Sequence, residues 1–80
     1  MPKIDGKSGD GVQAVQLTLS ILEFLVHERR AVGVTALAQA LGTTKSRIHR
    51  HLQTLVQQGY IVQPQDSDRY ESGPRLVALG

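Results

Sequence analysis

The sequence predicts a small, mainly α-helical domain with one β-hairpin, which is a winged helix-turn-helix. Its 80 residues, 40% of them apolar, suffice for a single domain with a modest core. Two helical segments meet through a short turn that contains Gly42, the spacing typical of a helix-turn-helix. Two β-branched and aromatic stretches then flank a turn-forming segment at 64–68, which predicts a hairpin, or wing. Because the chain has no cysteine, helix packing has to stabilise this fold without disulfides.

The first helix follows a polar, glycine-rich leading segment. We expect residues 1–10 to form a disordered arm ahead of a domain that spans 11–73. From Val12 onward, apolar residues recur at steps of three and four, the periodicity of an amphipathic helix. The members of this stripe are Val12, Val15, Leu19, Leu22 and Val26, broadened by Ile21 and Leu25. Asp10 and Gln13 resemble a capping pair at its start, and Gly33 marks its far end.

The second and third helices form the helix-turn-helix. Thr35 is placed to cap a short helix that Gly42 ends in the left-handed conformation. Thr44 is placed to cap the third helix, 45–58, which Gly59 ends. On a helical wheel, three apolar residues of this third helix fall within about 80° of Ile48, and all four are expected to be buried. They are Ile48, Leu52, Leu55 and Val56.

The remaining segments predict the wing and the start of another helix. Residues 60–63 and 69–72 are strand candidates on either side of the turn-forming segment. Pro74 suits the first position of a final helix through Leu79, because its ring restricts the backbone to helical angles and it lacks an N–H that would go unpaired there. We expect 74–80 to be the start of a truncated helix.

The charges are distributed unevenly along the chain. The formal net charge is only +2, but residues 29–65 contain no Asp or Glu. The basic residues of this window are Arg29, Arg30, Lys45, Arg47 and Arg50. Such a stretch suits a polyanionic partner, although charge alone fits a solvated basic face equally well. Three aromatic residues are too few for the stacking platforms that bind single strands or RNA, so we expect double-stranded DNA as the partner.

Other classes of function find little support in the residues. No apolar run is long enough for a membrane span, and the first ten residues do not resemble a signal peptide, so we expect a cytoplasmic protein with no membrane role. His49 and His51 stand two apart and point to different sides of a helix, which argues against a metal site. No set of nucleophile, histidine and acid is visible. We expect no cofactor, no metal and no enzyme activity.

The third helix carries the residues predicted to read bases. In helix-turn-helix proteins the second helix of the motif lies in the major groove, with its N-terminal residues at base edges. Arg47 and Arg50 are expected to bond guanine, and Gln53 adenine, in bidentate fashion. Ser46 completes the predicted base-reading set.

Other polar residues are predicted to bind phosphates. Thr44 and Lys45 sit at the start of the third helix, where a hydroxyl, an ammonium and free backbone N–H groups suit an anion. The predicted phosphate contacts also include Thr35, His49 and Arg69. Asp66 and Asp68 precede Arg69 closely and are expected to make the wing a weak contact, because phosphates repel carboxylates.

Several motifs of the chain occur together in one known family. They are Leu41-Gly42, the run 49–61 with His-Arg-His-Leu and Gly-Tyr, Tyr70, and the Gly-Pro-Arg-Leu exit at 73–76. Over residues 12–80 the chain resembles the N-terminal domain of IclR-type transcriptional regulators. The resemblance implies a winged helix-turn-helix, a homodimer on a pseudo-palindromic operator, and a linker helix leading to an effector-binding domain missing from this chain. Leu17 and Arg47 depart from it, since an arginine and a threonine are usual there.

A second interpretation remains open at this point. A winged-helix domain can also serve as a protein–protein interaction module, docking a partner through the apolar segment 76–79 or through the first helix. The two interpretations differ in footprint: added duplex DNA perturbs residues 45–57 under the first and leaves them unchanged under the second.

Overall fold

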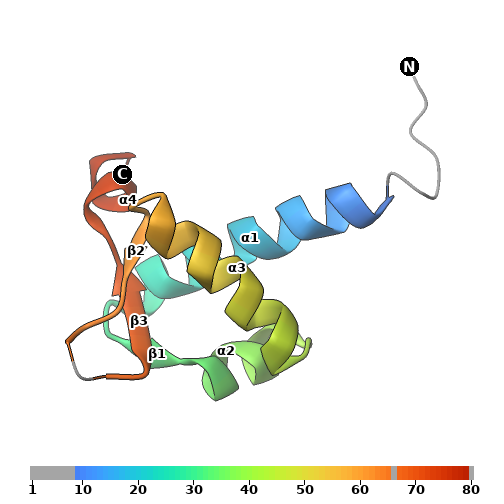
Figure 1. Ribbon diagram of the computed structural model, residues 1–80, viewed down its shortest axis with the longest axis horizontal. Helices are drawn as coiled ribbons and strands as arrows, with labels where there is room; N and C mark the ends of the chain where they lie inside the picture. The colour runs from blue at the N-terminus through green and yellow to red at the C-terminus, as the bar shows by residue number, and fades with distance from the viewer. Residues whose placement is uncertain (1–8, 66, 80) are drawn as a thin grey trace.

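The computed structural model describes residues 9–65 and 67–79 and confirms a winged helix-turn-helix (Figure 1). Its elements are α1 (Gly9–Glu28), β1 (Val32–Gly33), α2 (Val34–Leu41), α3 (Lys45–Gln57), β2 (Ile61–Val62), β3 (Arg69–Ser72) and α4 (Pro74–Leu79). The expected arm at residues 1–8 lies outside the described residues, as does Asp66 of the predicted turn. Within the described ranges, no helix combines the length and apolar character needed to cross a membrane.

The wing belongs to a three-stranded antiparallel sheet rather than to an isolated hairpin. Its strand order is β1-β3-β2, with Val32 opposite Tyr70 and Ile61 opposite Ser72. Strand β1 was not predicted, because two residues between helices carry no strand periodicity. Its pairing with Arg69 and Tyr70 attaches the connection between α1 and α2 to β3, so the wing is joined directly to the helix-turn-helix.

One core holds α3 in place. Its buried members are Ile21, Leu25, Val32, Leu37, Ala38, Ile48, Leu52, Leu55, Ile61 and Tyr70. They come from the first three helices and all three strands, so the helices and the wing share a single core. Three of them, Ile48, Leu52 and Leu55, form the underside of α3 as predicted. Val56 does not, because its side chain is 38% exposed.

Helix α1 differs from the prediction at both ends. Gly9 and Asp10 are already helical, so the arm does not include them, and Asp10 lies inside the helix rather than at its cap. The helix ends at Glu28, ahead of Gly33. Arg29 follows with a positive φ of 58°, and its N–H donates to the carbonyl of Leu25 at 3.2 Å. A residue with a side chain in this left-handed conformation costs about 1–2 kcal/mol.

The apolar stripe that predicted α1 is not its buried face. We call the residues Val12, Val15, Leu19, Leu22 and Val26 the α1 stripe. Four of them are between 46% and 58% exposed, whereas Ile21 and Leu25 are buried. The helix therefore has two apolar faces, of which one packs on the core and the other faces outward.

The turn between α2 and α3 follows the local sequence, except at its first cap. Gly33, not Thr35, stands at the N-cap of α2, and no side chain caps this end. The prediction for Thr35 was wrong because pairing of β1 with β3 starts the helix earlier. Gly42 is left-handed with φ 66°, as predicted. The Thr44 hydroxyl accepts a hydrogen bond from the Arg47 N–H at 3.2 Å, which confirms it as the N-cap of α3.

Helix α4 starts against the end of α3 (Figure 1). The Gly73 N–H donates to the Tyr60 carbonyl at 2.8 Å, and the Arg75 N–H donates to the Gly59 carbonyl at 3.2 Å. Arg75 Nη1 also donates to the Gln58 carbonyl at 3.2 Å, and its guanidinium lies 5.2 Å from the centre of the Tyr60 ring. Pro74 is the first residue of α4, as predicted.

Candidate nucleic-acid interface

The polar face of α3 is open to solvent along its length. All the site residues predicted on or next to this helix are exposed: Thr44, Lys45, Ser46, Arg47, His49, Arg50 and Gln53. In Figure 1, α3 crosses in front of α1 and no other element covers it in that view. Because the apolar underside is fixed in the core, these side chains are held outward on a rigid helix.

The outward face divides into a crest and two flanks. At about 100° per residue, Arg50 lies opposite the buried underside, while Arg47 and Gln53 lie roughly 60° to either side of it. The surrounding clefts agree with this order. Arg47 shares a cleft with Ala14 and Thr18 of α1. Gln53 shares another with His49 of α3 and with Gln63 and Tyr70 of the wing side.

Among the described residues, the cationic side chains of α3 form no ion pair or side-chain hydrogen bond. The ion pair in the described part of the chain joins Arg30 Nε to Glu28 Oε1 at 3.1 Å, and it involves no residue of α3. Side-chain hydrogen bonds on α3 run to its own carbonyls, from Thr54 Oγ1 to Arg50 at 3.4 Å and between His51 Nδ1 and Arg47 at 2.9 Å. No acceptor among the residues that the structure describes bonds to the side chains of Lys45, Arg47 or Arg50, so their donors are open to an outside acceptor.

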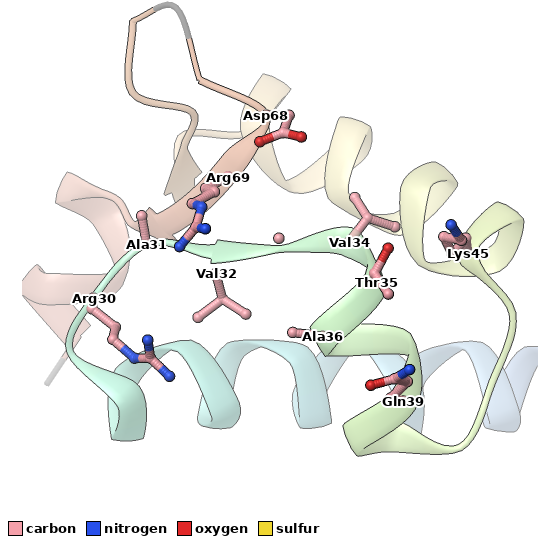
Figure 2. Close-up of a pocket in the computed structure, with 11 residues that line it drawn as sticks. Arg30, Ala31, Val32, Val34, Thr35, Ala36, Gln39, Lys45, Asp68 and Arg69 are labelled. Atoms are coloured by element: carbon pink, nitrogen blue, oxygen red, sulfur yellow. The ribbon is translucent and has the colours of Figure 1, made fainter.

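A second basic feature lies beside α3, at the start of α2. A cleft of about 580 Å³ brings together three predicted phosphate contacts, Thr35, Lys45 and Arg69. Figure 2 shows Arg30 and Arg69 toward one end and Lys45 toward the other. Asp68 also lines the cleft, so its charge opposes that of the nearby Arg69. The uncapped N-terminus of α2 forms part of the lining, and its N–H groups and helix dipole favour an anion there.

The structure also places at this surface several residues that are not among the predicted base-reading and phosphate-binding residues. Gln57 is exposed two turns after Arg50 on the same face of α3, a spacing that could have identified it. Arg30 and Gln39 line the α2 cleft, and Gln63 lines the wing-side cleft. No sequence signal joins these residues to α3, because their proximity results from the tertiary fold.

The two neighbouring histidines lie on different sides of α3. His49 lines clefts on the side of α2 and the wing, and His51 lines the cleft toward α1. His51 is partly buried, and its Nδ1 is engaged by the Arg47 carbonyl. The two rings are thus not arranged to share a ligand.

Known proteins are similar to this chain in both sequence and fold. The sequence profile of the IclR helix-turn-helix domain matches residues 14–65, more than half of the chain. The chain is 36% identical over 74 residues, 92% of its length, to the HTH-type transcriptional regulator KdgR of Dickeya chrysanthemi, and 33% identical over 69 residues, 86% of its length, to the glycerol operon regulatory protein of Streptomyces coelicolor. It covers 24% and 27% of these two relatives, so it spans about a quarter of their length.

Solved structures of related proteins show the same fold. The crystal structure of an IclR transcriptional regulator from Alicyclobacillus acidocaldarius superposes with a TM-score of 0.76 at 32% identity, over 84% of this chain and 27% of that one. The part of that regulator that matches is again about a quarter of it. The chain therefore belongs to the IclR helix-turn-helix family and is the DNA-binding domain of a transcriptional regulator.

Proposed function

We propose that this domain recognises a specific operator by placing α3 in the major groove of double-stranded DNA. The observation that carries the proposal is the open polar face of α3, which has no acidic residue and is backed by a fully buried underside. Arg50, at the crest, reads a guanine, and Ser46 and Gln53 contact neighbouring bases. The domain acts by occupying DNA, with no chemistry, cofactor or metal of its own.

Phosphate contacts position α3 on both sides of the groove. Thr44 and Lys45 contact the backbone at the start of α3, and His49 does so along its side. Lys45 also faces the α2 cleft with Thr35 and Arg69, which supports a second contact with the same backbone. The Asp68 carboxylate keeps the wing contribution small.

The α1 stripe supports a homodimer. Its residues alternate in steps of three and four, as in the seam of a coiled coil, and most of them face solvent. A cleft of about 530 Å³ continues this surface toward α4, where Leu76 and Leu79 meet Leu19, Leu22 and Val26. A second copy of this helix, related by a two-fold axis, buries the same stripe from both sides. The protein–protein interaction alternative is then unnecessary, because the dimer accounts for its apolar surface.

The chain spans about a quarter of the length of these relatives, so we propose that it is part of a longer regulator. Since the curated relatives are about four times as long, we propose that α4 leads toward a separate effector-binding domain. In this proposal the whole protein acts in the bacterial cytoplasm, and the effector binds away from the DNA-binding domain.

The deciding experiment is selection of bound duplexes from a random DNA pool. We expect a two-fold symmetric consensus with half-sites about one turn, ~10 base pairs, apart. If each protomer neutralises ~4 phosphates, the logarithm of the binding constant falls with the logarithm of salt concentration at a slope near −7 per dimer. A pool that yields no consensus refutes specific recognition. A binding constant that does not change with salt concentration refutes DNA binding altogether.

A further inference from the structure

A cleft of about 570 Å³ runs between α1 and α3 on the side away from the wing. Its lining is Ala14, Thr18, Arg47, Arg50, His51, Thr54 and Leu55. Two arginines are part of this lining, and no acidic residue is, among the residues that the structure describes. The cleft is therefore a cationic recess that opens beside the recognition surface.

The two arginines are not equivalent in position. Arg50 lines this cleft and also the one on the opposite side of α3, with Val34 and Lys45, so it straddles the crest. Arg47 lines the cleft toward α1 but not the one on the opposite side of α3. An α-helix with its side chains is roughly 10–12 Å across, and the major groove is about 12 Å wide. A helix of this size fills the groove, so crest residues meet base edges on the floor. A long cationic side chain on a flank, such as Arg47, reaches the phosphates of the wall, whereas the neutral Gln53 on the other flank keeps the base contact proposed above.

The other polar groups of the cleft have few donors left for an anion. Thr18 Oγ1 donates its hydrogen to the Ala14 carbonyl at 2.8 Å. His51 Nδ1 lies 2.9 Å from the Arg47 carbonyl, which can only accept, so this nitrogen carries the hydrogen. Thr54 Oγ1 donates to the Arg50 carbonyl at 3.4 Å. The guanidinium groups of Arg47 and Arg50 are thus the cationic donors of this lining that have no hydrogen bond among the described residues.

We propose that Arg47 is a backbone clamp, which binds a DNA phosphate at the mouth of the α1–α3 cleft, and that Arg50 is the arginine that determines base specificity. This inference rests on the proposed function, since it assumes α3 in the major groove. It divides roles between two residues that the sequence places together as base readers. The His51 ring, whose Nδ1 is bonded to the Arg47 carbonyl, lines the same cleft beside the proposed clamp.

Matched substitutions separate the two roles. Affinities of Arg47→Ala, Arg47→Lys, Arg50→Ala and Arg50→Lys are measured on the selected consensus and on a scrambled duplex, at several salt concentrations. Arg47→Ala is expected to weaken binding to both duplexes by the same factor and to reduce the salt slope by about 0.9 per protomer. Arg47→Lys restores most of the affinity, because a phosphate accepts a point charge. Both Arg50 variants lose the preference for consensus over scrambled DNA, because lysine cannot reproduce the bidentate contact.

Modified DNA provides an independent readout. A methylphosphonate removes the charge of one phosphate, and 7-deazaguanine removes one acceptor of a single guanine. We expect one methylphosphonate position to weaken the wild-type protein but not Arg47→Ala, and one 7-deazaguanine position to weaken the wild-type protein but not Arg50→Ala. Coupling of Arg47 to a guanine, or a changed preference at one base in Arg47→Ala, overturns the inference and leaves the proposed function standing. A wild-type protein that shows no consensus refutes the proposed function instead.

Discussion

The anchoring of α3 is tested by truncating one apolar side chain on each side of its buried boundary. Leu52 is fully buried beneath α3, whereas Val56, on the next turn, is 38% exposed. Removing three carbons from a buried leucine costs about 2.7–5 kcal/mol, from lost transfer energy and the cavity left behind. A chain of 80 residues has a total stability of roughly 4–12 kcal/mol, at ~0.05–0.15 kcal/mol per residue. Leu52→Ala therefore removes a large share of the stability of the domain.

Val56→Ala is the matched control, on the same helix. Its small loss of buried surface is opposed by the better helix propensity of alanine, so its effect is expected within about 0.5 kcal/mol of zero. Urea unfolding followed by circular dichroism measures both changes. DNA affinity measured well below the melting temperature of each variant is expected to be unchanged for Val56→Ala. Equal losses of stability in the two variants would refute the orientation of α3 described above, since a helix rotated toward Val56 buries both side chains.

Three further predictions concern other segments. Arg29→Gly is expected to raise the free energy of unfolding by about 0.5–1 kcal/mol, because glycine adopts the positive φ at this position without steric cost. The greater backbone entropy that glycine loses on folding offsets part of this gain, and a lower melting temperature of the variant would contradict the prediction. Thr44→Ala is expected to cost about 1 kcal/mol by removing the cap of α3, whereas Thr35→Ala leaves thermal stability nearly unchanged because Thr35 caps nothing; equal losses would restore Thr35 as a cap. Leu19→Glu is expected to abolish dimers in sedimentation velocity without lowering the melting temperature, while Gln16→Glu, also exposed on α1, leaves them intact; a dimer that survives Leu19→Glu excludes the α1 stripe as its interface.

The parts of the fold that the sequence predicted correctly depend on local chemistry. Thr44 caps α3 because its hydroxyl reaches the N–H of the residue three positions later, and Gly42 ends α2 because it adopts a positive φ without strain. Both effects act within one helical turn and are visible in a few consecutive residues. The wing was predictable for the same reason, from two β-branched or aromatic stretches around a turn.

The errors arose where distant residues decide the structure. Helix α1 carries apolar residues on two faces, and only packing against α2 and β3 determines that Ile21 and Leu25 turn inward. Thr35 has the chemistry of a cap, yet the pairing of Val32 with Tyr70 moves the start of α2 to Val34. Periodicity and capping preferences contain no information on either contact.

The candidate site likewise combines features that the local sequence determines with features that depend on tertiary contacts. Its residues on α3 follow from one helical wheel, since the exposed face is the complement of the buried one. The clefts on its flanks do not, because they join residues as far apart in the sequence as Lys45 and Arg69, or Thr18 and Arg47. The proposed distinction between a base-reading Arg50 and a phosphate-binding Arg47 therefore rests on these clefts rather than on the helical wheel.

The junction of α3 and α4 has a mechanical consequence. A Cβ on Gly73 would come within 2.9 Å of three backbone atoms, the Gly59 oxygen, the Tyr60 carbon and the Ile61 nitrogen, so the two chain segments are in direct contact at that point. Arg75 adds two hydrogen bonds to the last carbonyls after α3, and these resist bending between the helices. A rotation of α4 is thus expected to change the tilt of α3. In the proposed dimer on one operator, such a tilt would alter the distance between the two α3 helices. It would therefore change the fit of both helices to their half-sites at the same time.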